Sequence, residues 1–379
     1  MKKTHLILTI NLISIWLCST TQLQAELFDV YFGSNGKTSD GIYHGKFNDK
    51  NGKITNAKQT VDIYSPAFLA KNPIRPIIYA VAGKKETVVA AYAIADDGQL
   101  NAINQVPSGD GNSAHISVHP TGQFLITAQY RAGSVLVYPI DEKGAVKEHS
   151  QLIKHTGGSK IIPRRQESPH PHWSGFSPDG KFAFIPDLGC DQIVIYKVDL
   201  KSKKLLAHGN AKVAPGSAPR HMRFSVDGRF IFLLNEISLT VSTFAYNASN
   251  GSTKLLKTVQ TLSDEIKKKE ASNAASEILV HSNGKFIYTA NRGNDSVTTY
   301  HLESKSGTLT PGEVEPIRGS WPRSINLDPT AKWLLAAGQF SNTISVFSID
   351  EKTGELTFSN KNIINIPSPS CILFSKKNH

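Results

Sequence analysis

The feature that most constrains the fold is a turn motif that recurs along the chain. In each copy an alternating strand leads into a tight polar turn and an apolar strand follows, as in "HWSGFSPDGKFAFIPD", which starts at His172. The last residue of the turn is Gly122, Gly180, Gly228, Gly284 or Ala331 in successive copies. Self-similarity at a period of roughly 50 residues is the signature of a repeat architecture. The chain is therefore expected to be an array of similar units.

Each unit is expected to form four antiparallel strands. After the apolar strand come a polar connection, a third strand that ends in an acidic turn, and a fourth strand such as "LLKTVQTL". Four antiparallel strands at this period are typical of one blade of a β-propeller. Six units are visible, the first being a looser copy that starts at Ser65. The segment from Glu26 supplies the later strands of a seventh unit.

The missing inner strand of that seventh unit is the C-terminal segment "SPSCILFSKK". Pairing of the N-terminal and C-terminal strands in one blade would close the ring and hide its edges. We therefore predict an all-β fold: a single seven-bladed β-propeller over residues 26–379, with four antiparallel strands per blade.

Residues 1–25 have the pattern of a cleaved secretion signal. "MKK" is a short positive head, "LILTINLISIWLC" is an apolar stretch, and "LQA" ends on a small residue. The alternative interpretations are a membrane anchor and a buried first strand. With the signal removed we predict a periplasmic or secreted protein without membrane association.

Cysteine content and charge exclude several classes of protein. Only Cys190 and Cys371 follow the leader, in units far apart, so neither a disulfide framework nor a cysteine metal site is expected. The formal net charge is +11, but the basic residues are scattered over turns. The one basic run, "IKKKE" at 266–270, is flanked by acids, which favours a solvated surface over a nucleic-acid track.

The polar residues that interrupt the apolar pattern gather at one face of the predicted propeller. The first strand of a blade lines the channel and the second runs antiparallel to it, so the start of the first and the end of the second share a face. The residues at these positions are His115, His170, His172, Arg220, His221 and Arg323, and Tyr130, Asp187, Asn235, Glu236, Asn291, Arg292 and Gln339. Such convergence on one concavity predicts a ligand site. The alternative is that these groups bond strand ends and plug the channel.

The residue types indicate the chemistry of such a site. Arginine forks suit a ligand that is anionic or becomes anionic in the transition state. A carboxylate and a histidine can activate a water for attack on an ester carbonyl, and Arg220, Arg292 or Asn235 could face the oxyanion. This inventory suits lactone hydrolysis. No G-x-S-x-G elbow supports covalent serine catalysis.

A metal is the weaker alternative. His170 and His172 alternate like zinc ligands on a strand, and a third ligand would have to come from His115 or Asp187. We predict neither a metal nor another cofactor.

Four segments carry a resemblance to a known family, in the family's order: "PHPHWSGFSPDGKFAFIPDLGCDQIVIYKVD", "GSAPRHMRFSVDGRFIFLLNE", "YTANRGNDSV" and "PSPSCILF". The chain resembles the seven-bladed-propeller lactonases, which include bacterial 6-phosphogluconolactonases and fungal carboxy-muconate cyclases. The resemblance implies catalytic roles for the His170–His172 pair, Arg220, Glu236 and Arg292. The remaining predicted substrate-binding residues, taken from the channel mouth, are Asn235, Arg323, His115, Asp187, Tyr130 and Gln339.

The chain also departs from the family pattern, at "AVAGKKE", "AQY" and "AGQ", where amides or a carboxylate are common. These departures bear on the identity of the substrate more than on the fold. We predict a monomeric, metal-independent lactonase acting on a sugar lactone, with Glu236 or a histidine of the "PHPH" segment as general base. The alternatives are a muconate cyclase-like enzyme and a non-catalytic propeller that binds a ligand or protein through rim aromatics such as Trp173 and Trp321.

Overall fold

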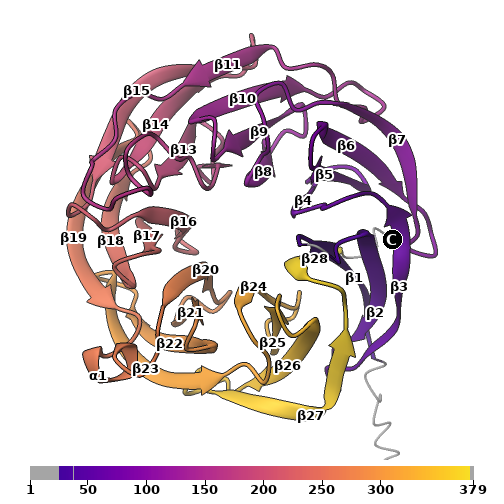
Figure 1. Cartoon of the computed structure of the whole chain (residues 1–379), viewed down its shortest axis with the longest axis vertical. Coiled ribbons are helices and arrows are strands. Elements are labelled where there is room, and N and C mark those ends of the chain that lie inside the picture. Colours follow the sequence, from indigo (N-terminus) through magenta and orange to yellow (C-terminus); the bar gives the residue numbers. More distant parts are fainter. Residues whose placement is uncertain (1–24, 37, 376–379) are drawn as a thin grey trace, which may run out of the picture.

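The computed structural model of the protein describes residues 25–36 and 38–375. In this part of the chain seven four-stranded antiparallel sheets stand around a central axis (Figure 1). The prediction of an all-β, seven-bladed propeller is therefore confirmed. The secretion signal predicted over residues 1–25 lies, except for its last residue, outside the described residues, and the domain boundary at 26 stays a prediction.

The blades are numbered here in chain order and their strands given from the channel outward. Blade 1 holds β28 (Pro369–Ser375), β1 (Leu27–Ser34), β2 (Gly41–Asn48) and β3 (Ile54–Asp62). Blade 2 holds β4 (Phe68–Lys71), β5 (Ile77–Gly83), β6 (Thr87–Ile94) and β7 (Leu100–Pro107). Blade 3 holds β8 (His115–Val118), β9 (Phe124–Gln129), β10 (Ser134–Pro139) and β11 (Gln151–Lys154). Blade 4 holds β12 (Gly175–Phe176), β13 (Phe182–Asp187), β14 (Gln192–Asp199) and β15 (Lys204–Lys212).

The last three blades follow the same plan. Blade 5 holds β16 (Pro219–Phe224), β17 (Phe230–Asn235), β18 (Thr240–Asn247) and β19 (Ser252–Gln260). Blade 6 holds β20 (Ala274–Val280), β21 (Phe286–Arg292), β22 (Ser296–Glu303) and β23 (Thr308–Pro316). Blade 7 holds β24 (Pro322–Leu327), β25 (Trp333–Gly338), β26 (Thr343–Ile349) and β27 (Leu356–Asn365).

The ring closes through the two ends of the chain, as predicted. The C-terminal strand β28 pairs antiparallel with β1, with Tyr31 opposite Leu373 and Gly33 opposite Cys371. Blade 1 is thus built from both ends of the sequence, which Figure 1 shows as the meeting of its first and last colours. Closure of this kind covers the edge of β1, which would otherwise be free to pair with another chain.

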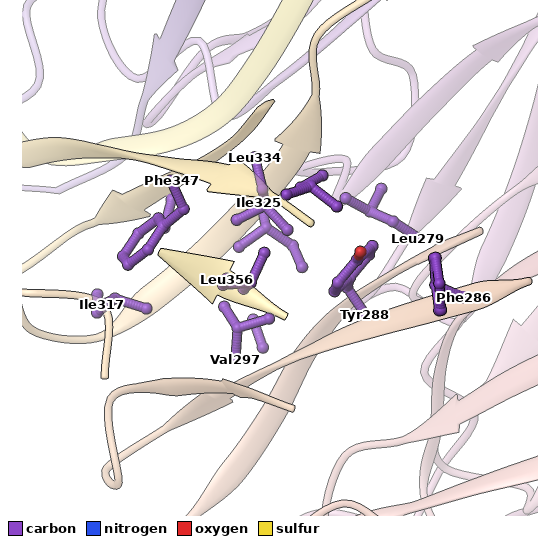
Figure 2. Close-up of a cluster of buried hydrophobic side chains, with 12 residues drawn as sticks. Leu279, Phe286, Tyr288, Val297, Ile317, Ile325, Leu334, Phe347 and Leu356 are labelled. Atoms are coloured by element: carbon purple, nitrogen blue, oxygen red, sulfur yellow. The ribbon is translucent and has the colours of Figure 1, made fainter. Parts of the chain in front are cut away.

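The blades pack on one another through apolar side chains. Figure 2 shows the cluster between blades 6 and 7, which includes Tyr288 of β21, Leu334 of β25 and Phe347 of β26. All three side chains are fully buried. Each side chain of this size contributes about 1.5–3 kcal/mol when it leaves water, so these interfaces stabilise the ring and hold its inner strands in place.

The repeated turn has a backbone reason for its glycine. Gly180 adopts φ +72°, and its amide donates to the carbonyl of Ser177 at 2.9 Å. Ala331 occupies the same position in blade 7 at φ +56°. An L residue in this left-handed region costs about 1–2 kcal/mol. Blade 7 therefore keeps the turn geometry of the repeat at this cost.

Blade 4 departs from the regular pattern at its inner strand. β12 has only two residues because Pro169 and Pro171, which precede it, have no amide proton to donate to the sheet. His170 and His172 were predicted to begin this strand but precede it. The amide of His172 still donates to the carbonyl of Pro186 at 3.0 Å, so His172 is held against the next strand.

The helix α1 (Asp264–Lys267) is a single turn on the outside of the ring. Ser263 caps it by accepting from the amide of Ile266, and none of its residues is buried. The basic run at 266–270 is therefore a surface turn. Within the described residues, Cys190 and Cys371 are both unpaired. No helix in the described ranges is long and apolar enough to cross a membrane.

Candidate active site

A cavity of about 780 Å³ lies at one mouth of the central channel. Several blades contribute to its wall, which is dominated by basic and other polar side chains. The charged and titratable residues that line it are Lys84, Tyr64, Tyr130, Arg131, Arg165, His172, Arg220, His221, Glu236, Arg292 and Arg323. Basic groups outnumber the single carboxylate, so the cavity suits an anion.

Strand pairing explains why residues far apart in sequence meet here. At the start of β16, Pro219 pairs with Asn235 at the end of β17, so Arg220 and Glu236 lie next to one another. Ala274 at the start of β20 likewise pairs with Arg292 at the end of β21. The same edge of each blade therefore delivers its side chains to the same mouth.

Glu236 is the centre of the charge cluster. Its Oε1 lies 2.7 Å from Nη2 of Arg165, and its Oε2 lies 2.9 Å from Nε of Arg220 and 3.2 Å from Nη2 of Arg292. Burial alone would raise the pKa of Glu236, but Arg292 and Arg220 outweigh it and hold that pKa far below the usual range. The carboxylate is thus ionised, and each of its two oxygens is bound by at least one guanidinium group.

The arginines differ in how many of their N–H groups already have protein partners. Arg220 is 2% exposed and also donates to the carbonyl of Ser276. Burial and the charge of Arg292 lower the pKa of Arg220 to about 9, so Arg220 stays cationic at neutral pH. Arg292 also donates to the carbonyls of Ala274 and Ala275.

Arg323 is a half-buried arginine of the cavity wall that is left open to a ligand. It lies at the start of β24. In the described part of the chain its guanidinium makes no hydrogen bond or ion pair. Burial and Arg292 lower the pKa of Arg323 to about 10, which keeps it charged at neutral pH. A bound anion would supply the partner that it lacks.

Two neutral histidines share the cavity wall. The ring centroids of His172 and His221 lie 5.4 Å apart. Burial, reinforced by Arg220, lowers the pKa of each well below 6.5. Nε2 of His172 lies 3.8 Å from Oε2 of Glu236, and its Nδ1 is buried without a partner. Both rings are therefore uncharged at neutral pH and able to accept a proton.

Arg165 was not found from the sequence. It lies between β11 and β12, outside the strand repeat, and reaches Glu236 while also donating to the hydroxyl of Tyr130 at 3.3 Å. Burial would lower its pKa, but Glu236 raises it, so Arg165 stays charged. No strand position marked this residue, and "RR" at 164–165 was the sole signal. Lys84 and Arg131, both exposed, were also missed, although they follow the second strands of blades 2 and 3.

Of the residues predicted from sequence, the cavity brings together His172, Arg220, His221, Glu236, Arg292, Arg323 and Tyr130. Six others do not line it: His170, Asp187, Asn235, Asn291, Gln339 and His115. The ring of His170 stacks on Tyr130 with centroids 4.6 Å apart, and its Nδ1 lies 2.7 Å from the carbonyl of Tyr130.

The other five are also engaged in structural contacts. Asn291 donates to Ser296 and Thr298. Asp187 accepts from the amides of His170 and Gly189. Asn235 donates to Thr240 and Ser242. Gln339 donates to the carbonyl of Asn35. His115 is buried behind the cavity, with its ring centroid 5.5 Å from that of His221.

The structure also bears on the two alternatives of a metal site and of a binding surface formed by rim aromatics. Among residues 25–36 and 38–375 no three histidine, cysteine, aspartate or glutamate side chains are grouped so as to hold a metal ion. Trp173 is buried at 7% exposure. Trp321 lies between Arg292, whose guanidinium carbon is 5.4 Å from the Trp321 ring, and the exposed Phe340, which stacks on it.

The fold and the cavity define a β-propeller with a cavity lined by cationic side chains at its channel mouth. Residues 29–374 match the model of the family described as "Lactonase, 7-bladed beta-propeller". The 6-phosphogluconolactonase of Bacillus subtilis is 31% identical over 338 residues, which cover 89% of this chain and 95% of that protein. That of Formosa agariphila is 34% identical over 329 residues, covering 84% and 91%.

A solved structure gives the same result. The periplasmic gluconolactonase of Pseudomonas aeruginosa superposes with a TM-score of 0.86 at 27% identity, covering 93% of this chain and 99% of that one. The chain belongs to the lactonase family of seven-bladed β-propellers. The resemblance seen in its sequence motifs is thus confirmed, and at the level of the family so is the prediction of a lactone-hydrolysing enzyme.

Proposed function

We propose that the protein hydrolyses a sugar lactone in the cavity at the channel mouth, using protein side chains alone. The observation that carries the proposal is the unpaired guanidinium of Arg323, which faces the same cavity as the cluster of Arg220, Arg292 and Glu236. Hydrolysis of a lactone passes through an oxyanion and ends in a carboxylate. Fixed guanidinium groups stabilise both.

Glu236 is better suited to holding the arginines than to taking a proton. Both oxygens of Glu236 are already bound by guanidinium groups, so neither is free to take a proton from a water. The proton of the attacking water therefore passes to a neutral histidine. His172, which the sequence offered for this role, and His221 are the two histidines of the cavity wall.

The relatives and the cavity support a sugar lactone as the substrate. Two relatives bear the name 6-phosphogluconolactonase and one similar structure that of a periplasmic gluconolactonase. A cavity of about 780 Å³ lined by cations has room for a sugar ring with or without a phosphate. The signal predicted over residues 1–25 supports a periplasmic or secreted enzyme. We also propose that the enzyme acts as a monomer.

The proposal is tested by proton release from lactones. The chain from Glu26 onward is given glucono-1,5-lactone and 6-phosphogluconolactone at constant pH, each corrected for spontaneous hydrolysis. We expect saturable acceleration with at least one of them, and the preferred substrate shows whether the cations bind phosphate. Absence of acceleration with both would contradict the proposal and favour a binding propeller.

A further inference from the structure

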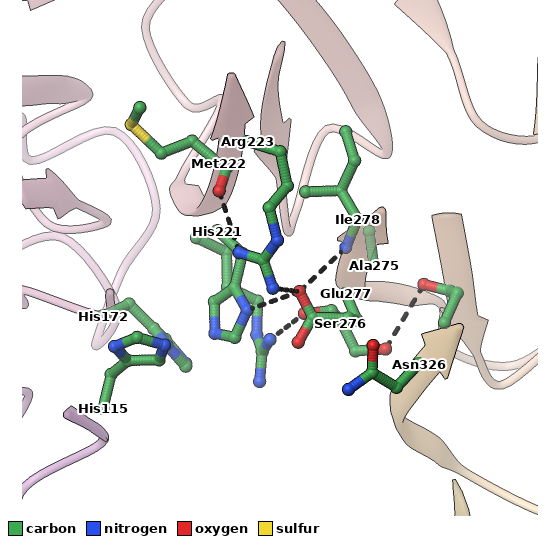
Figure 3. A network of polar contacts seen from close by, with 12 residues as sticks. His115, His172, His221, Met222, Arg223, Ala275, Ser276, Glu277, Ile278 and Asn326 are labelled. Carbon is green, nitrogen blue, oxygen red and sulfur yellow. Dashed lines mark hydrogen bonds and ion pairs between the residues drawn. The ribbon is translucent and has the colours of Figure 1, made fainter. Parts of the chain in front are cut away.

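A second buried ionic cluster adjoins the cavity, and neither the resemblance nor the Glu236 cluster accounts for it. Figure 3 shows Glu277 of β20 beside His221 and Arg223 of β16. Its Oε1 lies 3.0 Å from Nδ1 of His221, 3.0 Å from Nη2 of Arg223 and 3.1 Å from the amide of Ile278. Glu277 and His221 are each 2% exposed.

Irregular strand pairing positions both residues. The register of β20 against β21 shifts between Ala275 and Ile278, so Glu277 lies within the irregularity. The register of β16 against β17 shifts between Pro219 and His221. Such bulges redirect side chains and occur often beside active sites. Two neighbouring blades thus depart from regular pairing at the point where His221 and Glu277 meet.

This contact fixes the orientation of the imidazole. An ionised carboxylate only accepts hydrogen bonds, so Nδ1 of His221 carries the proton and Nε2 carries the lone pair. Within the described residues Nε2 makes no hydrogen bond, and the ring lines the cavity. A histidine whose tautomer is held by a carboxylate while its other nitrogen faces the substrate is the usual arrangement of a general base.

His172 has no such support. Its Nδ1 is buried and unpaired. The carboxylate nearest its Nε2 is that of Glu236, at 3.8 Å, which already binds the guanidinium groups of Arg165 and Arg220. Within the described residues, no hydrogen bond from His172 to a carboxylate therefore selects its tautomer.

We propose that His221 is the general base of lactone hydrolysis and that Glu277 is the residue that positions it. This inference rests on the proposed function. Nε2 of His221 takes a proton from water as the water oxygen bonds to the carbonyl carbon, and the carbonyl π electrons move to the oxyanion. The tetrahedral intermediate then expels the ring oxygen, which receives that proton from Nε2. Lactone and water thus give the hydroxy acid, and His221 is neutral again.

The surroundings keep His221 in its basic form. Burial lowers its pKa well below 6.5, and the arginines of three blades act in the same direction. The charged and titratable groups that face it are Arg220 and Arg223 on β16, Glu277 on β20, Arg292 on β21, Arg323 on β24, His115 on β8 and His172 before β12. At neutral pH the imidazole of His221 is therefore unprotonated, and its Nε2 can accept a proton.

Kinetics of three variants test the assignment with a lactone that the wild type hydrolyses. We expect His221→Gln to lower kcat by about 10²–10⁴-fold with KM nearly unchanged. Glu277→Gln should lower kcat by about ten-fold or more, since an amide permits the wrong tautomer. It should also move the acid limb of the pH profile to lower pH, because a carboxylate partner favours the imidazolium. The exposed His149→Gln should match the wild type.

Two further comparisons complete the test: a variant of His172, the alternative base, and a check that each variant folds. His172→Gln should lose less kcat than His221→Gln; the reverse order would overturn the assignment. Thermal unfolding checks that each variant folds, and added imidazole should restore turnover to folded His221→Ala, which a purely structural role would not allow. Lack of rescue in a folded variant would contradict the proposal. A wild type without lactone turnover would overturn the proposed function as well, whereas an active wild type with an active His221→Gln would overturn this assignment alone.

Discussion

At Glu236 one carboxylate holds the charges of Arg165, Arg220 and Arg292 in place. Removing one partner of a buried ion pair leaves uncompensated charges, which costs about 3–5 kcal/mol. Glu236→Gln is therefore expected to lower the free energy of unfolding by an amount of that order and to reduce turnover by displacing the arginines. Urea unfolding followed by circular dichroism measures the first effect.

The matched control is Glu265→Gln. Glu265 pairs with Lys269 on the outside of the ring, where the side chain of Glu265 is 83% exposed. Its loss should leave the unfolding midpoint unchanged, because exposed pairs contribute little. If Glu236→Gln unfolded at the same urea concentration as the wild type, the central role of Glu236 in the cluster would be wrong.

Selecting polar residues at the predicted strand ends identified part of the site. A sequence pattern does not show which way each of these side chains points. Neighbouring residues of an extended strand face opposite ways. Asn235 therefore turns to Thr240 and Ser242 while Glu236, the next residue, meets the arginines. Distinguishing the two needs the exact end of the strand, which a sequence pattern defines only to within a residue or two.

Among the strands, β28 is the one that closes the ring, and we expect the stability of the whole ring to depend on it. β28 supplies the inner strand of blade 1, and its Ile372 is 3% exposed in the core between blades 1 and 7. A chain truncated after Ile366 would expose the edge of β1 and lose this packing. We expect it to lose cooperative thermal unfolding, measured by circular dichroism, and to aggregate.

A change of similar size elsewhere provides the comparison. Replacing residues 264–270, which include α1, with a Gly-Ser linker removes no buried side chain. That variant should unfold close to the wild-type temperature. Cooperative unfolding of the truncated chain at the wild-type temperature would mean that closure by β28 does not stabilise the ring.

Elements that follow the repeat were predictable and the interruption of the repeat was not. The turn spacing identified the blades and the C-terminal closing strand because each unit repeats one hydrophobic pattern. Residues 155–174 follow no such pattern, and they carry Arg165 into the cavity and shorten β12 to Gly175–Phe176. Likewise, the bulge that brings Glu277 to His221 depends on strand register, which composition does not reveal.

The molecule as a whole buries three neutral histidines beside its channel. Burial lowers the pKa of His115, His172 and His221 well below 6.5 in the folded state. Below pH 6.5 the unfolded chain binds protons that the folded chain does not, so the stability they contribute is present above this pH and lost below it. Each histidine can remove up to about 1.4 kcal/mol per pH unit.

We therefore expect the urea midpoint to fall between pH 7.5 and pH 5.5. Glu236, whose folded-state pKa is depressed, adds a further loss only below about pH 4.5. The exposed His149→Asn should show the same fall as the wild type. A midpoint that stayed constant or rose on acidification would contradict neutral burial of the three histidines.

The central claim is that the channel-mouth cavity is where the lactone is hydrolysed, and Arg323 tests it most directly. Its guanidinium has no partner to lose among the residues that the structure describes, so Arg323→Gln should fold normally. Arg318→Gln is the control, since Arg318 pairs with Glu315 on the outer part of blade 6. The measurement is kcat/KM for lactone hydrolysis. We expect a fall of about ten-fold or more for Arg323→Gln, as for a lost charge-assisted hydrogen bond, and none for Arg318→Gln. Equal kcat/KM for Arg323→Gln and the wild type would show that the reaction does not take place in this cavity.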